Sequence, residues 1–197
     1  MNVLVFDTET TGLSNSRLPP HDPSQPDLIQ MGAILYDDER DVIRGEINLI
    51  VHDPAVAVPE GAANVHGIKT EIAAQYGLPL VVVMATFNNL LKIADATVCH
   101  NAPYDLIVAK KAYYKLNRPH PFSEKPAMCT MEMLTDKMNL PPSQRMRDKG
   151  MTQPKPPSLM EAYRFVTGGL SFEGAHDAMA DVRATLEIYK WIKRNMT

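Results

Sequence analysis

The sequence contains few cysteines, no long apolar run and no excess of positive charge. Its two cysteines, Cys99 and Cys129, are far apart in the chain and stand among apolar residues, which favours two buried thiols over one disulfide. The longest apolar run, residues 78–85, contains a proline and is too short to span a bilayer. No basic segment precedes the first apolar stretch, so we expect no signal peptide, no membrane contact and a cytoplasmic location.

The formal net charge of −3 is unusual for a nucleic-acid-binding protein, because such proteins usually carry a basic surface. If four of the carboxylates bind metal cations, however, the remaining balance becomes slightly positive, so a phosphate-bearing substrate is not excluded. A chain of 197 residues with 45% hydrophobic and 22% charged residues is typical of a globular protein with one sizeable core. We therefore predict a single domain over residues 1–197.

An apolar stretch near the start of the chain, residues 3–6, is followed by two closely spaced acids. The β-branched residues in this stretch predict a buried strand, and residues two apart in a strand point to the same face. Asp7 and Glu9 therefore project side by side, and their repulsion is relieved where a cation lies between them. Carboxylate oxygens suit Mg²⁺ or Mn²⁺. The alternative is a solvated strand end that carries two ordinary surface acids.

The rest of the chain alternates between strand and helix patterns. Two further strands should complete an antiparallel meander with the first, and two short later strands should each lead into a helix. The predicted strands after the first cover residues 28–36, 42–51, 97–99 and 128–130. The predicted helices cover residues 60–64, 69–75, 80–94, 102–116, 131–139, 158–166 and 178–194. Ser158 and Glu161 have the spacing of a capping box at the start of one of these helices.

Two proline-rich stretches, residues 14–27 and 140–157, lack helix and strand periodicity and are predicted to be loops. The second stretch contains one acid, Asp148, and four cations. These cations are Arg145, Arg147, Lys149 and Lys155. They are candidates for phosphate contacts, and a solvated linker is the alternative. Four other cations are expected to lie on a solvated helix face. They are Lys110, Lys111, Lys115 and Arg118.

Two later segments bring further acids to the starts of helices. Asn101 is a predicted N-cap for the helix that carries Asp105, which places this carboxylate at the carboxyl end of a strand, where α/β sheets bind ligands. Alternatively, Asp105 only offsets the helix dipole. His176 and Asp181 would lie about 140° apart within one helix. They can face the same point if Asp177 caps the final helix and His176 lies on the preceding turn.

The segment from Asp7 to Leu13, the segment from Asn101 to Asp105, and His176 followed five residues later by Asp181 together resemble the DEDDh group of 3′→5′ exonucleases. This group includes the proofreading subunit of bacterial replicative polymerases, ribonuclease T and oligoribonuclease. The resemblance covers nearly the whole chain. It implies an α/β, ribonuclease-H-like fold, which is a mixed five-stranded sheet with helices on both faces.

The resemblance also implies a site with two divalent ions, Mg²⁺ or Mn²⁺, and His176 as the general base. The implied metal ligands are Asp7, Glu9, Asp105 and Asp181. The sequence departs from the commoner family pattern in two places. Tyr104 stands where phenylalanine is frequent, and the loop over residues 14–27 is longer and richer in proline than usual.

The implied activity is that of a 3′→5′ exonuclease that releases nucleoside 5′-monophosphates from single-stranded DNA ends. Two cations about 4 Å apart offset charge on the phosphoryl group and activate water, and an ordinary imidazole can accept the proton of that water near neutral pH. The expected partner is a single-stranded nucleic acid with a free 3′-hydroxyl, and a polymerase or another replication or repair protein is a second candidate. An RNA-trimming exoribonuclease of the same family and an inactive nucleic-acid-binding module are the alternatives.

Four residues near these segments are candidate substrate contacts. Thr10 lies beside the predicted acids, and Leu13 can wedge against the terminal base unless it is a core leucine. His66 and Asn101 are weaker candidates. For His66 a structural role is favoured.

Overall fold

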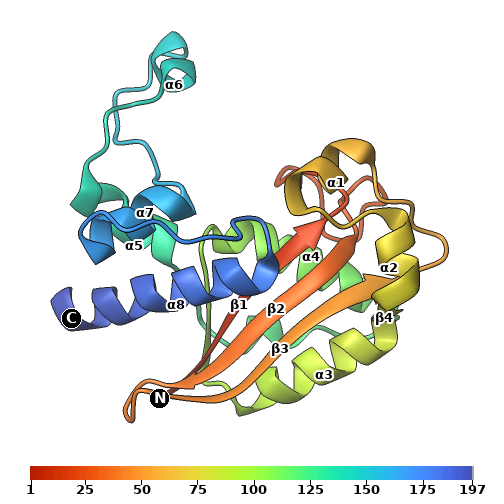
Figure 1. The fold of residues 1–197 in the computed structure, drawn as a ribbon. Helices are drawn as coiled ribbons and strands as arrows, with labels where there is room; N and C mark the ends of the chain where they lie inside the picture. The colour runs from red at the N-terminus through yellow and green to blue at the C-terminus, as the bar shows by residue number, and fades with distance from the viewer. Residues whose placement is uncertain (197) are drawn as a thin grey trace.

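The strands of residues 1–196, the part of the chain that this computed structural model describes, form one mixed sheet with the order β4-β3-β2-β1-β5-β6 (Figure 1). The strands are β1 (Asn2–Thr10), β2 (Leu28–Asp37), β3 (Val42–His52), β4 (Leu78–Pro79), β5 (Ala96–Cys99) and β6 (Ala127–Cys129). The first three make the predicted antiparallel meander, and β5 and β6 run parallel to β1. The predicted α/β fold is therefore confirmed, and the two-residue β4 adds a sixth strand to the five expected.

Helices cover both faces of the sheet, as expected. The helices are α1 (Glu60–His66), α2 (Thr70–Tyr76), α3 (Leu80–Ile93), α4 (Ala102–Lys115), the 3₁₀ helix η1 (Pro121–Ser123), α5 (Thr130–Met138), α6 (Gln144–Asp148), α7 (Leu159–Thr167) and α8 (Ala178–Asn195). α3 and α4 pack on one face and α8 on the other (Figure 1). α5 and α7 pack against the C-terminal half of α8 around Leu134, Ala162, Ile188 and Ile192.

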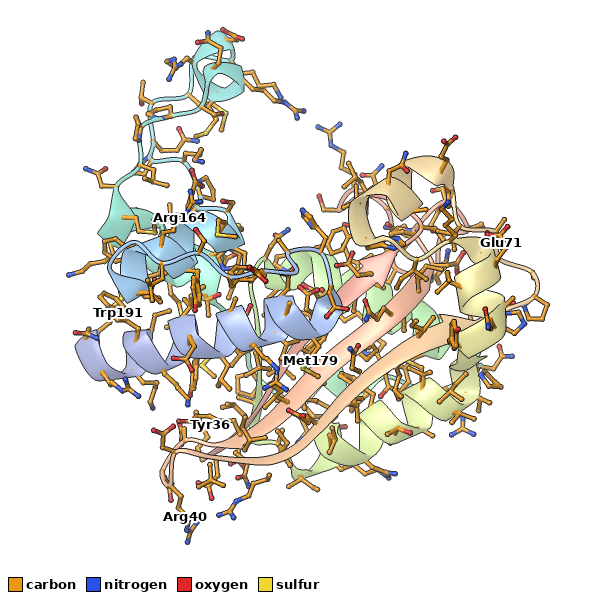
Figure 2. All side chains as sticks on the ribbon, in the orientation of Figure 1. Tyr36, Arg40, Glu71, Arg164, Met179 and Trp191 are labelled. Atoms are coloured by element: carbon orange, nitrogen blue, oxygen red, sulfur yellow. The ribbon has the colours of Figure 1, made fainter. Side chains whose placement is uncertain are left out.

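β1 is buried on both of its faces, which explains its continuous apolar run. Leu4 and Phe6 pack in the cluster that includes α3 and α4. Val3 and Val5 pack in the cluster that includes Met179 of α8, which is labelled in Figure 2. Because side chains alternate along a strand, β1 presents its odd-numbered residues toward α8 and its even-numbered residues toward α4.

The arm, residues 140–157, extends away from the rest of the chain (Figure 1). At its tip lies α6, whose N-cap Ser143 accepts a hydrogen bond from the backbone N–H of Met146. At its base, Lys155 N donates to Leu140 O at 3.0 Å. The prediction of a loop throughout this stretch is wrong at α6, because a five-residue helix with one side-chain cap is too short to show periodicity.

The other proline-rich stretch, residues 14–27, has turns but neither helix nor strand in the described structure, as predicted. The buried side chain of Gln25 holds it together, accepting from Asn15 N at 3.0 Å and donating to Asn15 O at 2.8 Å. Lys111 Nζ donates to Gln25 O and lies 3.2 Å from the carboxylate of Asp27. Lys111 is only 7% exposed, so its assignment to a solvated face is wrong, and it instead fastens this loop to α4.

Other local predictions are confirmed. Cys99 and Cys129 are free and buried, and they lie opposite each other on β5 and β6. Ser158 and Glu161 form the expected capping box at the start of α7, and Asp177 caps α8. No helix within residues 1–196 is both long and apolar enough to cross a membrane.

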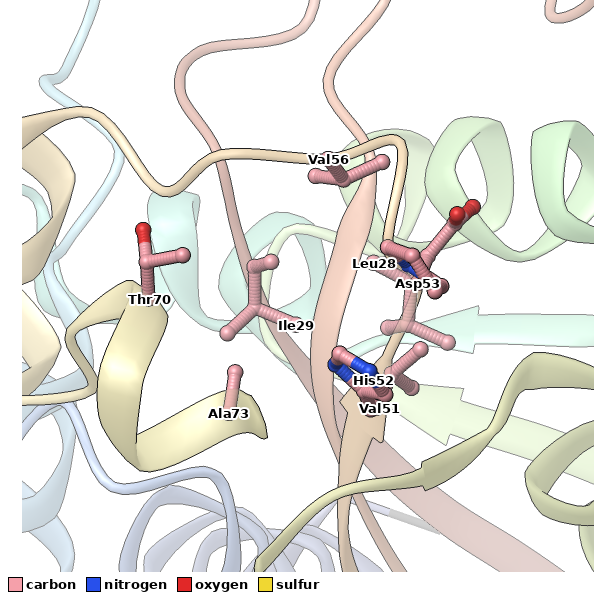
Figure 3. Close-up of a pocket in the computed structure, with 9 residues that line it drawn as sticks. Leu28, Ile29, Val51, His52, Asp53, Val56, Thr70 and Ala73 are labelled. Atoms are coloured by element: carbon pink, nitrogen blue, oxygen red, sulfur yellow. The ribbon is translucent and has the colours of Figure 1, made fainter. Parts of the chain in front are cut away.

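A small cavity lies between the end of β3 and α2 (Figure 3). Its walls include the apolar side chains of Leu28, Ile29, Val51, Val56 and Ala73. Two polar groups at the cavity already have partners within the protein, since Asp53 pairs with Lys115 at 2.8 Å and Thr70 Oγ1 accepts a hydrogen bond from Val58 N at 2.9 Å. None of the predicted site residues lines this cavity.

Candidate active site

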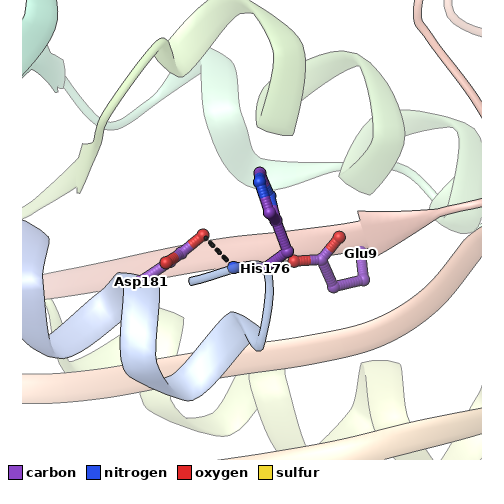
Figure 4. A group of neighbouring side chains, drawn as sticks. All are labelled: Glu9, His176 and Asp181. Atoms are coloured by element: carbon purple, nitrogen blue, oxygen red, sulfur yellow. Dashed lines mark hydrogen bonds between the residues drawn. The ribbon is translucent and has the colours of Figure 1, made fainter. Parts of the chain in front are cut away.

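The C-terminal end of β1 is the point at which the separate predicted segments meet. Asp7 and Glu9 are odd-numbered residues of β1 and therefore face α8, at whose start His176 and Asp181 lie (Figure 4). Ligand atoms of Glu9, His176 and Asp181 all lie within 4.8 Å of one another. Segments from opposite ends of the chain thus share one site.

Asp105 reaches the same end of β1 from the first turn of α4. β1 pairs with β5 only from Val3 to Val5, so the N–H groups that follow on that edge are available to other partners. Thr8 donates its N–H and its hydroxyl to Asp105 Oδ1 at 3.0 and 2.8 Å. Thr8 was not among the predicted site residues. The sequence feature that could have indicated Thr8 is its hydroxyl residue type between the acids Asp7 and Glu9, a position that faces the opposite side of the strand from these acids.

The four carboxyl groups hold their protons more tightly than ordinary acids do. Burial, followed by repulsion from neighbouring carboxylates, raises the pKa of Glu9 to about 8. Burial also raises the pKa of Asp105 to about 7 and that of Asp181 to about 6. Burial and then repulsion from Asp105 and Asp181 lift the pKa of Asp7 well above its ordinary value. Gathering four acids in this way is unfavourable unless a positive charge offsets them.

The donor set fits a hard divalent cation. Carboxylate oxygens are the ligands that Mg²⁺ and Mn²⁺ prefer. Asp181 Oδ1 is buried and has no hydrogen-bond partner among the described residues, which leaves one ligand oxygen available. A cation at this point would stabilise the charged carboxylates that burial and repulsion now disfavour.

His176 lies on the turn before α8, where an imidazole can face the acids. Its side chain is exposed, and its backbone is left-handed with a φ of 69°. The backbone N–H of His176 donates to Asp181 Oδ2 at 3.3 Å (Figure 4). Asp177 Oδ1 accepts the N–H groups of Met179 and Ala180, so the helix begins after Asp177 and His176 stays outside it.

The start of α8 lies directly on β2 at Gly32. A Cβ atom on Gly32 would lie 2.7 Å from both the backbone carbon and the backbone oxygen of Ala178. Glycine has no Cβ and therefore permits this approach. Gly32 was not among the predicted site residues, and its signal is a single glycine inside an otherwise apolar strand.

The turn after β1 is held by Tyr104 of α4. The hydroxyls of Thr10 and Tyr104 lie 2.5 Å apart, and the Tyr104 hydroxyl donates to Gly12 O at 2.8 Å. A phenylalanine at this position could not make these bonds. Leu13, the next residue of the turn, is 91% exposed, so the alternative that it is a core leucine is wrong.

His66 and Asn101 flank the site in different ways. His66 Nε2 lies 3.2 Å from Thr10 O, and His66 Nδ1 accepts the N–H of Ile68 at 3.1 Å, so both ring nitrogens bind the backbone. A carbonyl oxygen only accepts, which assigns the proton to Nε2, and burial lowers the pKa of His66. Asn101 is exposed at the N-cap position of α4 with a left-handed φ of 74°, and its side chain makes no capping hydrogen bond in the described structure.

Several solved structures of exonucleases are similar to this structure. The structure is similar to that of E. coli Exonuclease I in complex with a dT13 oligonucleotide, with 20% identity and a TM-score of 0.74 over 98% of this chain and 41% of that chain. A zinc-bound form of the E. coli Exonuclease I complex with single-stranded DNA gives 22% identity and a TM-score of 0.75 over 99% of this chain and 41% of that chain. Exonuclease I from Methylocaldum szegediense gives 22% identity and a TM-score of 0.72 over the same shares of the two chains.

This chain therefore spans about two fifths of the length of these neighbours, and identities at this level establish the fold alone. A search of curated protein sequences gave no significant match. The sequence model of the RNase T family, described as "Exonuclease", matches residues 4–189, which is nearly the whole chain. With the fold and this match in agreement, the chain belongs to the RNase T family of exonucleases.

Proposed function

We propose that this protein is a metal-dependent 3′→5′ exonuclease that releases nucleoside 5′-monophosphates from the ends of single-stranded DNA. The observation that carries the proposal is that ligand atoms of Glu9, His176 and Asp181 lie within 4.8 Å of one another, next to the half-buried carboxyl group of Asp7 and the buried one of Asp105. Repulsion between these acids is unfavourable without cations, and all five side chains are present. This argues against an inactive binding module.

Asp7, Glu9, Asp105 and Asp181 would hold two divalent ions, Mg²⁺ or Mn²⁺. When bound, such a pair of ions lowers the pKa of the attacking water and offsets charge on the phosphoryl oxygens and the leaving oxygen. The chain itself fixes the ligands, because Thr8 orients Asp105 and the His176 backbone N–H orients Asp181.

His176 is the proposed general base. Its imidazole lies beside Glu9 and Asp181 and is exposed, so a proton taken from the attacking water can pass on to solvent. Water attacks the phosphorus of the terminal nucleotide, and the bond from phosphorus to the 3′-oxygen of the preceding nucleotide breaks. That oxygen takes up a proton from solvent, and the products are a nucleoside 5′-monophosphate and a strand one nucleotide shorter.

The turn after β1 is the proposed contact for the 3′-terminal nucleotide. Leu13 exposes an apolar side chain that can lie against the terminal base, and Thr10 lies beside Glu9, where the free 3′-hydroxyl would be placed. His66 and Asn101 are secondary candidates, since both His66 ring nitrogens already bind the backbone. Neighbouring structures of E. coli Exonuclease I include complexes with dT13 and dA16 oligonucleotides and with single-stranded DNA, which supports a single-stranded substrate here.

A turnover assay tests the proposal on matched 5′-labelled single-stranded DNA, duplex DNA and short RNA with Mg²⁺ or Mn²⁺. We expect single-stranded DNA to be shortened from its 3′ end, with no reaction in EDTA or in Asp7→Ala. Asp136→Ala, which removes an exposed carboxylate from α5, is the matched control and should keep full activity. Faster turnover of RNA would identify an RNA-trimming exoribonuclease instead. Activity that persists in EDTA, or in Asp7→Ala, would refute the metal-dependent mechanism.

His176→Ala should lower kcat by about 10²-fold or more, as expected for a lost general base. His21→Ala, in an exposed part of the loop over residues 14–27, is the control for loss of an imidazole. A kcat in His176→Ala equal to that of the wild type would contradict the role given to His176.

A further inference from the structure

Gln30 is a buried polar side chain near the start of β2. It lies on β2 directly opposite Glu9 of β1 and is only 4% exposed. Its Nε2 donates to Asn48 Oδ1 at 2.8 Å and to Asp177 Oδ2 at 3.0 Å, and its Oε1 accepts the backbone N–H of Ala178 at 3.2 Å. The orientation of the amide follows from chemistry, because a backbone N–H can meet only the oxygen and a carboxylate can meet only the NH₂ group.

Gln30 and Asp177 together connect the start of α8 to the strand next to Glu9. Asp177 uses Oδ1 to cap the first turn of α8 and Oδ2 to accept from Gln30. His176 precedes this capping residue, and Asp181 follows one turn later, with Asp181 N donating to Asp177 O at 3.0 Å. His176 and Asp181, the two side chains that lie near Glu9, are therefore on either side of Asp177, the residue that Gln30 holds.

The close approach of Ala178 to Gly32 limits how near α8 lies to β2, but the apolar contacts between α8 and the sheet are not directional. Val182 and Met179 pack against Val3, Val5 and Ile34, and such apolar contacts allow a helix to slide or rotate by a fraction of an ångström. The hydrogen bonds that Gln30 makes with Asp177 and Ala178 are directional, and the one to the Asp177 carboxylate is charge-assisted. They define where the first turn of α8 lies along β2.

We propose that Gln30 is a positioning residue, which fixes His176 and Asp181 over Glu9 through its bonds to Asp177 and Ala178. This inference rests on the proposed function, because positioning matters only where these side chains act together. Its effect should appear in kcat rather than in KM, since the proposed substrate contacts Thr10 and Leu13 lie on a different segment.

The arrangement of hydrogen-bond donors and acceptors between Gln30 and Asp177 provides a test whose result could not come from loss of folding. In Gln30→Glu the new carboxylate faces the carboxylate of Asp177, which is repulsive. In Asp177→Asn the new NH₂ group faces that of Gln30, and turning the Gln30 amide around would then oppose its NH₂ to the N–H of Ala178. In the double variant every donor meets an acceptor again, because the carboxylate now accepts from Ala178 and from the new amide, while the Asn48 amide can turn around. Its net charge equals that of the wild type.

The experiment measures kcat and KM on single-stranded DNA together with hydrogen–deuterium exchange of a peptide that covers the first turn of α8. We expect each single variant to lower kcat on the order of 10- to 100-fold, with KM little changed and faster exchange in residues 178–181. The double variant should recover most of both losses. Gln75→Glu, the same substitution at an exposed position of α2, is the control and should match the wild type.

Wild-type kcat in Gln30→Glu, or a double variant no better than the weaker single variant, would overturn the proposal. So would a loss of kcat without any change in exchange at the start of α8. If one single variant fails to fold, the other and the double variant still decide. If the wild type degrades no nucleic acid, the proposed function fails, and the exchange data alone decide whether Gln30 fixes the start of α8.

Discussion

Gly32→Ala should separate the start of α8 from the sheet and so disturb both stability and catalysis. A Cβ atom at Gly32 would lie 2.7 Å from the carbon and oxygen of Ala178 and 3.0 Å from Met179 N, whereas ordinary contacts begin at 3.4 Å. All three obstructing atoms are backbone atoms, so no side chain can turn away to make room. The first turn of α8 or strand β2 must therefore move.

The size of the effect follows from this overlap. Forcing one extra methyl group into a well-packed contact costs about 1–3 kcal/mol, and each kcal/mol lowers the Tm of a domain of this size by about 2–4 °C. Because α8 carries Asp181 and His176 lies on the turn just before it, the same movement displaces both side chains from Glu9. A misplacement on the order of 1 Å can reduce the rate by about 10²-fold.

Gly45→Ala is a matched control in the neighbouring strand β3. A Cβ atom there would meet only Leu90 Cδ2 at 3.5 Å, which is ordinary contact. Thermal unfolding and steady-state kinetics on single-stranded DNA should show losses of Tm and kcat in Gly32→Ala and neither loss in Gly45→Ala. Equal Tm and kcat in the two variants would refute the claim that the approach of α8 to Gly32 positions the site.

Three further results are expected. In EDTA, the Tm should fall as the pH rises from about 4.5 to about 8, because folding raises the pKa of Glu9 from 4.5 to about 8 and the folded state must then ionise a buried acid. Adding Mg²⁺, or the substitution Glu9→Gln, should make the Tm depend less on pH. A Tm that rises between these pH values would contradict the prediction. Leu13→Ala should raise KM for single-stranded DNA without changing Tm, because the side chain is 91% exposed, and an unchanged KM would remove Leu13 from the substrate contacts. Replacing both Arg145 and Lys149 on the exposed arm by alanine should weaken the binding of long oligonucleotides more than that of short ones, and the binding constant should then depend less on salt concentration. An unchanged salt dependence of the binding constant would show that the arm makes no phosphate contact.

Features that depend on neighbours in sequence could be predicted from the sequence alone. The apolar run of β1, the projection of Asp7 and Glu9 to one face, and the caps at Ser158 and Asp177 follow from strand alternation and from hydrogen bonds spanning a few residues. The spacing of the three motif segments was specific enough to indicate the exonuclease family, which the match over residues 4–189 confirms.

Features that depend on contacts between distant segments were decided only by the tertiary structure. Thr8 and Asp105 are 97 residues apart, and Gln30 and Asp177 are 147 apart, so no local pattern pairs them. Lys111 is buried because a loop folds back onto α4 and supplies oxygens for its ammonium group. Composition and periodicity describe each segment separately. The side chains that hold the acids in place are recognisable only when the sheet has brought β1, β2, α4 and α8 together.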